Sequence, residues 1–414
     1  MEYSKSISYN KQQQKQHKQT GKRWAIVSIS SIPLVMTLGN SMLIPVLPTF
    51  ERKLGISSFQ SSMIITVYSI VAIILIPLAG YLSDRIGRKK VIIPSLLIAA
   101  IGGLIAGWAS WKLTDAYLFI LIGRILQGVG AAGASPIVLP LVGDLFKNEE
   151  EVSSSLGIIE TSNTFGKVLS PILGAFLAGV IWYLPFFAFP VFCLISILMM
   201  LFLVKSPRKS EVLPFKQFIY KIKMIFKEKG RWIYGIFFIG GILMYVLFGV
   251  LFFLSSMLED KHDIHGIHKG LVLAVPLAAL CLSSFITGKK INKNKVLMKW
   301  ISFIGTVLVA LSVFVISFSD NIWFLLSVFF FCGVGIGVSL PCLDALLTEG
   351  IEKEERGTIT SIYSSMRFVG VAVGPPVFAI LMKKSELFMF YSTTAICLLA
   401  GIISLFFIKP TQKS

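Results

Sequence analysis

Apolar residues recur along this chain in long blocks that short polar segments separate. A helix needs roughly 20 apolar residues to cross the hydrocarbon core of a bilayer. Twelve blocks of about that length cover residues 24–48, 60–82, 91–110, 116–140, 153–178, 181–204, 232–257, 269–288, 296–318, 321–347, 356–382 and 386–408. The short-range alternation typical of a membrane β-barrel is missing. The pattern therefore predicts an all-α polytopic membrane protein with twelve transmembrane helices.

A long polar segment, residues 205–231, divides six apolar blocks from six. Its phenylalanines and isoleucines follow helical spacing with lysines on the other face, so we expect an amphipathic helix on the inner leaflet. The first 23 residues lack the apolar core and cleavage site of a signal peptide and predict a disordered, basic cytosolic tail. The expected units are the tail 1–23, a bundle 24–204, the linker 205–231, a second bundle 232–408 and a cytosolic tail 409–414.

The two halves of the chain resemble each other at a nearly constant offset. A shift of 205 residues superimposes Gly128, Gly130, Pro136 and Asp144 on Gly333, Gly335, Pro341 and Glu349. A shift of 204 residues superimposes Gly166 and Pro171 on Gly370 and Pro375. Two like-oriented repeats of six helices around a cavity at the membrane midplane are an architecture of secondary transporters.

Composition and charge agree with a membrane location. With 55% hydrophobic and 14% charged residues, the chain has too few polar side chains to cover a soluble protein. If both termini are cytosolic, 29 of the 39 lysines and arginines lie on the cytosolic side, seven on the other side and three within spans. This bias fixes the expected orientation in the cell membrane. The net charge of +18 therefore reflects topology and not nucleic-acid binding.

The sequence gives little support for an enzyme or for a protein that binds a metal or cofactor. The five cysteines fall in apolar blocks at no metal-ligand spacing, and we interpret them as packing residues: Cys193, Cys281, Cys332, Cys342 and Cys397. No histidine lies within a span and no nucleotide-binding loop is present, so we expect neither an enzyme nor a cofactor or metal. The histidine-containing segment 259–268 is expected to be a solvated polar loop and not a metal site.

The fifth block carries two charges, Glu160 and Lys167. Seven residues make two helical turns, so both side chains lie on nearly one face, flanked by Asn163, Thr164 and Ser170. Charges at this depth cost free energy and suggest a function. We expect Glu160 to exchange protons, or alternatively to form a structural ion pair with Lys167. Lys167 favours an anionic or polyphenolic substrate over a cationic drug.

Further polar and aromatic residues occur within spans. Arg124 in the fourth block needs a carboxylate or carbonyl partner, and Glu160 is the carboxylate that we expect could pair with it. Asn40 lies between Pro33 and Pro45 in a stretch that should bend or break the first helix, and it could line the cavity or allow close helix packing. In the second half, Tyr245 and Phe248 could line the cavity, while Asp344 and Arg367 are candidate partners across it.

The segment between the second and third blocks, GYLSDRIGRKK, is unusually organised for a cytosolic turn. Glycines permit tight backbone geometry, an aspartate can accept hydrogen bonds, and the basic residues hold the segment in the cytosol. The residues concerned are Gly80, Asp84, Arg85, Gly87 and Arg88.

These motifs resemble those of the major facilitator superfamily over nearly the whole chain after the tail. GYLSDRIGRKK is similar to the signature loop that latches the cytosolic side of these transporters shut. IGRILQGVGAA resembles the helix-four motif of proton-coupled members and implies that Arg124 is the buried arginine and that Gln127 also belongs to the site. LGNSMLIPVLP resembles the helix-one motif of the drug:proton antiporter branch.

The helix-five motif of antiporters is partly kept. Gly157, Gly166, Pro171 and Gly174 keep its frame, while Ser170 and Ala175 replace two of its glycines. The chain is particularly similar to Gram-positive exporters of drugs or siderophores of the bacillibactin type. The resemblance implies a monomeric transporter in the bilayer that exports a small organic molecule in exchange for protons. A proton-coupled importer of a nutrient or organic anion is the alternative.

Overall fold

The computed structural model describes residues 2–146, 149–204, 220, 223–227, 230–291 and 294–408, without the side chains of 2–21, 149–150, 153 and 353–356. In these residues every long element is a helix. The first half contains α1 (Glu2–Ser41), η1 (Ile44–Val46), α2 (Leu47–Leu54), α3 (Ser58–Ile86), α4 (Arg88–Lys112), α5 (Tyr117–Ala134), α6 (Val138–Leu145), α7 (Glu149–Val180) and α8 (Leu184–Leu203). The second half contains α10 (Arg231–Asp260), α11 (Gly266–Lys290), α12 (Lys295–Ile316), α13 (Ile322–Gly350), α14 (Lys353–Lys384) and α15 (Glu386–Phe407).

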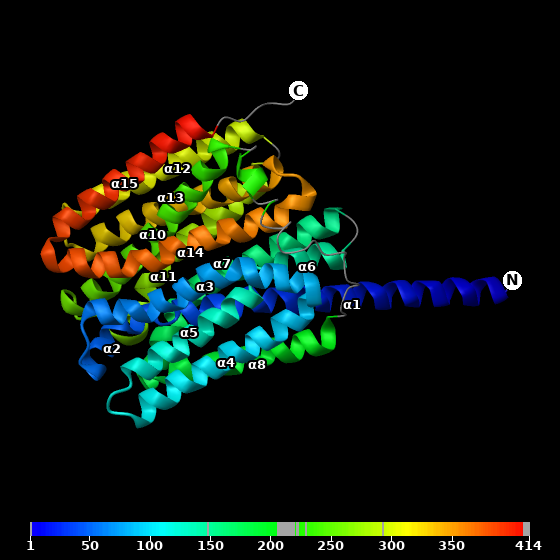
Figure 1. Ribbon diagram of the computed structural model, residues 1–414, viewed down its shortest axis with the longest axis horizontal. Helices are drawn as coiled ribbons and strands as arrows, with labels where there is room; N and C mark the ends of the chain where they lie inside the picture. Colours follow the sequence, from blue (N-terminus) through cyan, green and yellow to red (C-terminus); the bar gives the residue numbers. More distant parts are fainter. Residues whose placement is uncertain are drawn as a thin grey trace.

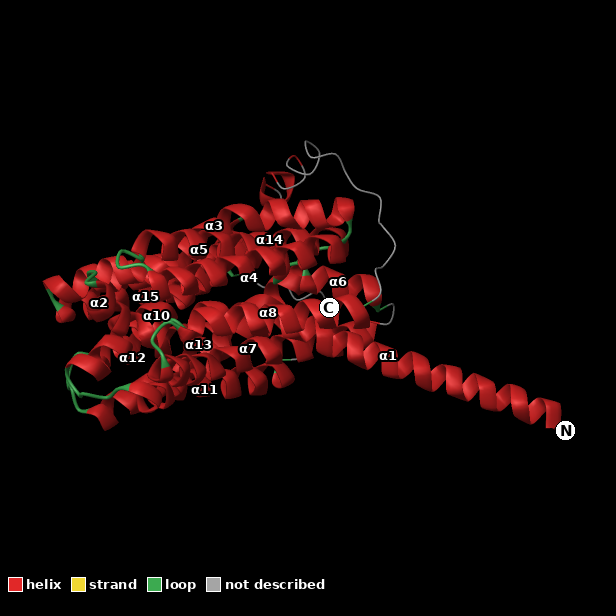
Figure 2. Cartoon of the chain, turned by 90° about the horizontal axis from the view of Figure 1, so that it is seen from below, coloured by secondary structure: helices red, strands yellow, loops and turns green. Residues whose placement is uncertain are grey.

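Twelve helical stretches in the described residues are long and apolar enough to cross a membrane, which confirms the predicted number of spans. They lie side by side along a common direction (Figures 1 and 2). Within the first half, α5 packs against α3 and α4; within the second, α13 packs against α11 and α12. The halves meet where α3 contacts α14 and where α7 contacts α11.

The glycines of the predicted repeat occupy equivalent helix crossings. A Cβ added at Gly128 would lie 2.5 Å from a backbone oxygen of α3, and one at Gly333 would lie 2.1 Å from a backbone oxygen of α11. Gly166 and Gly370 likewise face α1 and α10. Glycine at these positions lets helix backbones approach more closely than any side chain would allow. The repeat in the sequence therefore corresponds to repeated packing in the fold.

The first span breaks as its prolines predict. Helix α1 continues through Pro33 and ends at Ser41, after which Pro45 lies in the short η1 and a separate helix α2 follows. Proline lacks the backbone donor that a continuous helix requires there. The break places a short, buried segment at one end of the interface between the halves.

The N-terminal segment differs from the disordered tail that we expect. Helix α1 begins at Glu2, and its polar first part projects beyond the bundle (Figure 1). The segment contains no proline and is rich in lysine and glutamine, which have high helix propensity. Most of the predicted amphipathic linker helix lies outside the described residues, although 223–227 are helical, and so does the tail 409–414. All five cysteines are free.

Candidate functional site

The GYLSDRIGRKK motif is compact because α3 ends at Ile86 and α4 begins at Arg88. Gly87 between them has a φ of 105°, a conformation that side chains with a Cβ rarely adopt. Arg88 pairs with Asp84 and, through Nε at 3.0 Å, with Asp144 of α6. These ion pairs all lie within the first half, so in this conformation they organise the end of that half where α3 meets α4.

The other two residues of the motif, Gly80 and Arg85, take no part in these ion pairs. Gly80 lies inside α3 and not in a turn, and a Cβ there would be 3.7 Å from Ser361 Oγ of α14. The small residue therefore helps the two halves to approach each other. Arg85 is exposed.

Arg124 of α5 is completely buried and richly hydrogen-bonded. Its Nη2 donates to Asn40 Oδ1 at 2.5 Å, and its Nε donates to the Ile64 carbonyl oxygen at 2.7 Å. Its Nη1 donates to the Gly39 carbonyl oxygen at 3.1 Å and to the side chain of Gln127. Neutral oxygens therefore replace the water that this charge loses on burial.

The predicted pairing of Arg124 with Glu160 is wrong. The ring of Tyr68 lies over the Arg124 guanidinium, 4.5 Å from its centre. Polar groups of α1, among them Asn40, accept the hydrogen bonds of the guanidinium in place of a carboxylate of α7. Glu160 is instead exposed on α7. Asn40 and Gln127, which we expected at the substrate cavity, are buried and bonded to Arg124.

Arg124→Lys is expected to lower the free energy of unfolding by about 2 kcal/mol, because an ammonium cannot reproduce the spread of guanidinium donors and about two buried hydrogen bonds are lost. Thermal unfolding of the purified protein in detergent measures the effect. Arg85→Lys, at an exposed position of the GYLSDRIGRKK motif, should leave the unfolding temperature unchanged. Equal unfolding temperatures for the two variants would contradict the structural role of Arg124.

Glu160 and Lys167 share a face of α7 but differ in environment. Glu160 is exposed, whereas Lys167 is 9% exposed. Asn163 lies between them; it accepts a hydrogen bond from Thr37 Oγ1 at 2.6 Å, and its amide is 3.4 Å from the Glu160 carboxylate. The Thr164 hydroxyl donates its hydrogen to the Glu160 carbonyl oxygen of its own helix.

Lys167 belongs to a cluster of four charges that both halves supply. Its electrostatic neighbours are Arg367 of α14, Glu160 and Asp344 of α13. Arg367 Nη1 lies 3.6 Å from Asp344 Oδ1. Lys167 forms neither a hydrogen bond nor an ion pair with any residue that the structure describes. A buried ammonium without a close partner is costly, and an anionic or oxygen-rich ligand would offset that cost.

Tyr363 of α14 also belongs to this cluster, although the sequence interpretation missed it. Its ring lies 5.8 Å from the Arg367 guanidinium, and its hydroxyl faces Asp344 without hydrogen-bond geometry to any described residue. The residue is 3% exposed. Its position one helical turn before Arg367 is the sequence signal that could have identified it.

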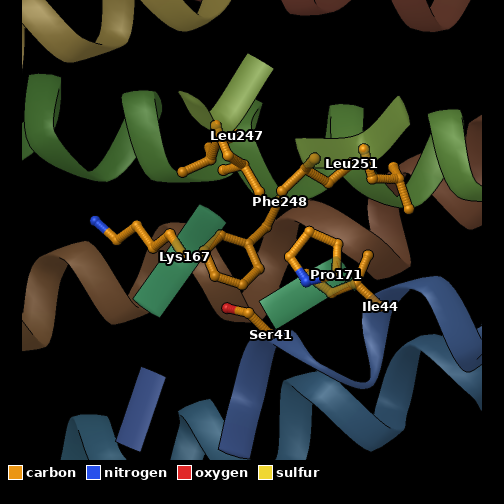
Figure 3. Close-up of a pocket in the computed structure, with 9 residues that line it drawn as sticks. Ser41, Ile44, Lys167, Pro171, Leu247, Phe248 and Leu251 are labelled. Carbon is orange, nitrogen blue, oxygen red and sulfur yellow. The ribbon is translucent and has the colours of Figure 1, made fainter. Parts of the chain in front are cut away.

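Lys167 borders a small recess between the two halves (Figure 3). The recess is lined by Ser41, Ile44, Lys167, Pro171, Leu247, Phe248, Leu251, Leu273 and Leu277. The ring of Phe248 lies between Lys167 and Pro171, and the ammonium points away from that ring. Tyr245, which we predicted to line the cavity together with Phe248, packs elsewhere. Its ring centroid lies 5.7 Å from that of Phe378, and its hydroxyl lies 3.5 Å from the Thr393 hydroxyl.

The helix-five motif lies mainly against α1. A Cβ at Gly166 would be 3.1 Å from Leu34, and one at Gly174 would be 2.0 Å from the Met42 carbonyl oxygen. Gly157 has no neighbour within 4 Å. The carbonyl oxygen of Pro171 would lie 2.5 Å from a Cβ at Gly270 of α11, so the motif also contacts the second half.

The loop after α10 contains ion pairs. Lys261 lies 3.3 Å from Asp320 and 2.9 Å from Glu386. Burial alone would lower the pKa of Lys261, but these two carboxylates raise it above its ordinary value. Within the described residues, no group of three or more His, Cys, Asp and Glu side chains could hold a metal ion.

Comparison with known proteins gives matches over almost the entire chain. The family model of the Major Facilitator Superfamily matches residues 29–375 and 298–414. The bacillibactin exporter of Bacillus subtilis is 55% identical over 391 residues, which cover 94% of this chain and 97% of that protein. Multidrug resistance protein 2 of Bacillus subtilis is 27% identical over 86% of this chain and 88% of its own. A crystal structure of a D-xylose-proton symporter superimposes with a TM-score of 0.76 at 15% identity, over 94% of this chain and 99% of that one.

Proposed function

The chain belongs to the major facilitator superfamily, and we propose that it exports a siderophore of the bacillibactin type in exchange for protons. The observation that carries this proposal is the 55% identity to the bacillibactin exporter over nearly the full length of both chains. The four-charge cluster supports it, because both halves supply its charges and transporters with alternating access bind their substrates between the halves. The fold of the sugar symporter alone would not distinguish export from import.

Proton coupling is assigned to Glu160 and Asp344. An ionised carboxylate accepts hydrogen bonds with both oxygens, and protonation removes part of that capacity. Phenolic hydroxyl groups of a siderophore donate to the same oxygens, so substrate and proton compete. Competition is reciprocal, because each ligand weakens the binding of the other. When the two halves alternate between access from inside and access from outside, the transporter therefore exchanges a proton for a substrate molecule.

In this proposal Lys167 and Arg367 bind the oxygen atoms of the substrate. Both side chains donate hydrogen bonds, and the ammonium of Lys167 has no close partner among the described residues. A cationic dye would meet uncompensated positive charge at Lys167, whereas a phenol or phenolate would be attracted. The site therefore favours polyphenolic or anionic molecules.

We place the transporter in the cell membrane with both termini in the cytosol. The excess of lysine and arginine in alternate connecting segments supports this orientation. A monomer is sufficient, because one chain supplies all four charges of the central cluster.

Inverted membrane vesicles with an acidic interior are expected to accumulate bacillibactin several-fold above vesicles that lack the protein. Downhill movement of protons out of the vesicle drives uptake of the substrate, so a protonophore should abolish the accumulation. A cationic dye measured in parallel should accumulate less. An importer that carries protons and substrate in one direction would instead drive bacillibactin out of these vesicles, and that result would overturn the proposal.

A further inference from the structure

One stripe of α10 forms the contact between the halves at the end opposite the GYLSDRIGRKK motif. Phe248, Ser255 and Glu259 are seven and four residues apart, so they lie on one face of this helix. All three are buried. Each contacts a different part of the first half, and the nature of the contact changes along the stripe from apolar to charged.

The innermost contact is apolar. The side chain of Phe248 occupies the space between Lys167 and Pro171 of α7 and lies beside Ser41 (Figure 3). Phe248 is 7% exposed. A molecule that moves from Lys167 toward the extracellular side along this interface must displace this ring.

The next contact is a hydrogen bond. Ser255 Oγ donates to the carbonyl oxygen of Ile44 at 3.1 Å, and both residues are buried. The same carbonyl oxygen also accepts the backbone N–H of Leu47, so the Ser255 hydroxyl uses its second lone pair. The broken first span thus supplies a backbone oxygen to the second half.

The outermost contact is an ion pair. Arg52 of α2 pairs with Glu259, and this is the ion pair that joins the two halves among the described residues. On its own side, Glu259 also accepts from Lys269 Nζ at 2.5 Å, and His265 Nδ1 lies 3.4 Å away. The side chains of Glu259 and Lys269 are 2% and 3% exposed, whereas that of Arg52 is 54% exposed.

We propose that Phe248, Ser255 and the Arg52–Glu259 ion pair form the outer gate of this transporter. The asymmetry of exposure allows the gate to open at low cost. When the halves separate, Arg52 moves into water, while Glu259 stays paired with Lys269 and no buried charge is left alone. The gate concerns the conformational cycle and not the substrate, so it can be tested without any transported molecule.

Arg52→Gln is expected to speed labelling of a cysteine at Ser41 several-fold when a membrane-impermeant maleimide is added to whole cells. Ser41 borders the recess beside Phe248, so it becomes reachable from outside only when the gate opens. The parent protein carries Ser41→Cys together with Cys281→Ser, because Cys281 is partly exposed. Lys53→Gln, which removes the neighbouring exposed cation, should label at the parental rate. Arg52→Lys should also stay near that rate because it keeps the charge.

Equal labelling of the Arg52→Gln variant and its parent would overturn the proposal. If that variant fails to reach the membrane, Ser255→Ala removes the other polar contact between the same segments and is judged by the same criterion.

Thermal unfolding provides a second test of the gate. Glu259→Gln should unfold at a lower temperature than Arg52→Gln, because it leaves the Lys269 ammonium buried without its carboxylate. Equal destabilisation by both changes would identify a structural ion pair and not a gate.

Discussion

Gly174→Ala is expected to lower the free energy of unfolding by about 3 kcal/mol, at the upper end of the usual cost of overfilling a packed interior. The new Cβ would lie 2.0 Å from the carbonyl oxygen of Met42 and 2.8 Å from the carbonyl carbon of the same residue. Both atoms belong to backbone, which cannot rotate away as a flexible side chain can. Helices α1 and α7 must therefore separate. The midpoint of thermal unfolding in detergent measures the loss.

Gly157→Ala is the matched control for this prediction. Both glycines belong to the same helix-five motif and both lie inside α7, but nothing lies within 4 Å of a Cβ at Gly157. Alanine is favoured over glycine in a helix interior by about 1 kcal/mol, so this variant should unfold at the same or a higher temperature. A similar loss for both variants would show that the cost at Gly174 does not arise from contact with the Met42 backbone.

The different roles of these two glycines show where sequence reasoning stops. Helical spacing identifies the motif, but the oxygen that excludes a side chain at Gly174 belongs to Met42 in the turn that follows α1. Periodicity within one helix contains no information about which turn meets a neighbour. The repeat was more informative, because Gly128 and Gly333 mark equivalent crossings in the two halves.

The fold itself could be predicted because a bilayer imposes strong rules on sequence. Hydrocarbon thickness sets the length of each span, and the distribution of lysine and arginine sets an orientation. The break of the first span follows from Pro45, which cannot continue an α-helix. The helical N-terminal segment was missed because polar composition was interpreted as disorder, whereas helix propensity favoured a helix.

The partners of the charged residues could not be predicted in the same way. Charge cost correctly indicated that Arg124 needs compensation, but neutral oxygens supply it and not Glu160. The ion pair between Arg52 and Glu259 joins residues far apart in the sequence, and neither residue belongs to a recognisable motif. A requirement for a partner is encoded locally, while the identity of that partner depends on how the helices pack.

Glu160→Gln is expected to reduce pH-driven uptake of bacillibactin into inverted vesicles by about tenfold, a typical size for coupling between two ligands. The amide still forms hydrogen bonds with the substrate but cannot bind or release a proton. Exchange of labelled for unlabelled bacillibactin without a pH gradient should therefore continue near the wild-type rate. The two assays on one vesicle preparation separate coupling from folding and from substrate binding.

Asp344→Asn tests the second carboxylate in the same pair of assays. Asp344 differs from Glu160 because Arg367 and Tyr363 accompany it in the second half, so loss of its charge also weakens the anchoring of Arg367. We therefore expect reduced exchange as well as reduced pH-driven uptake. Glu352→Gln, at an exposed position before α14, should change neither rate. Full pH-driven uptake in both the Glu160 and Asp344 variants would mean that neither carboxylate carries the proton, and the cluster would then be a structural network of charges between the halves.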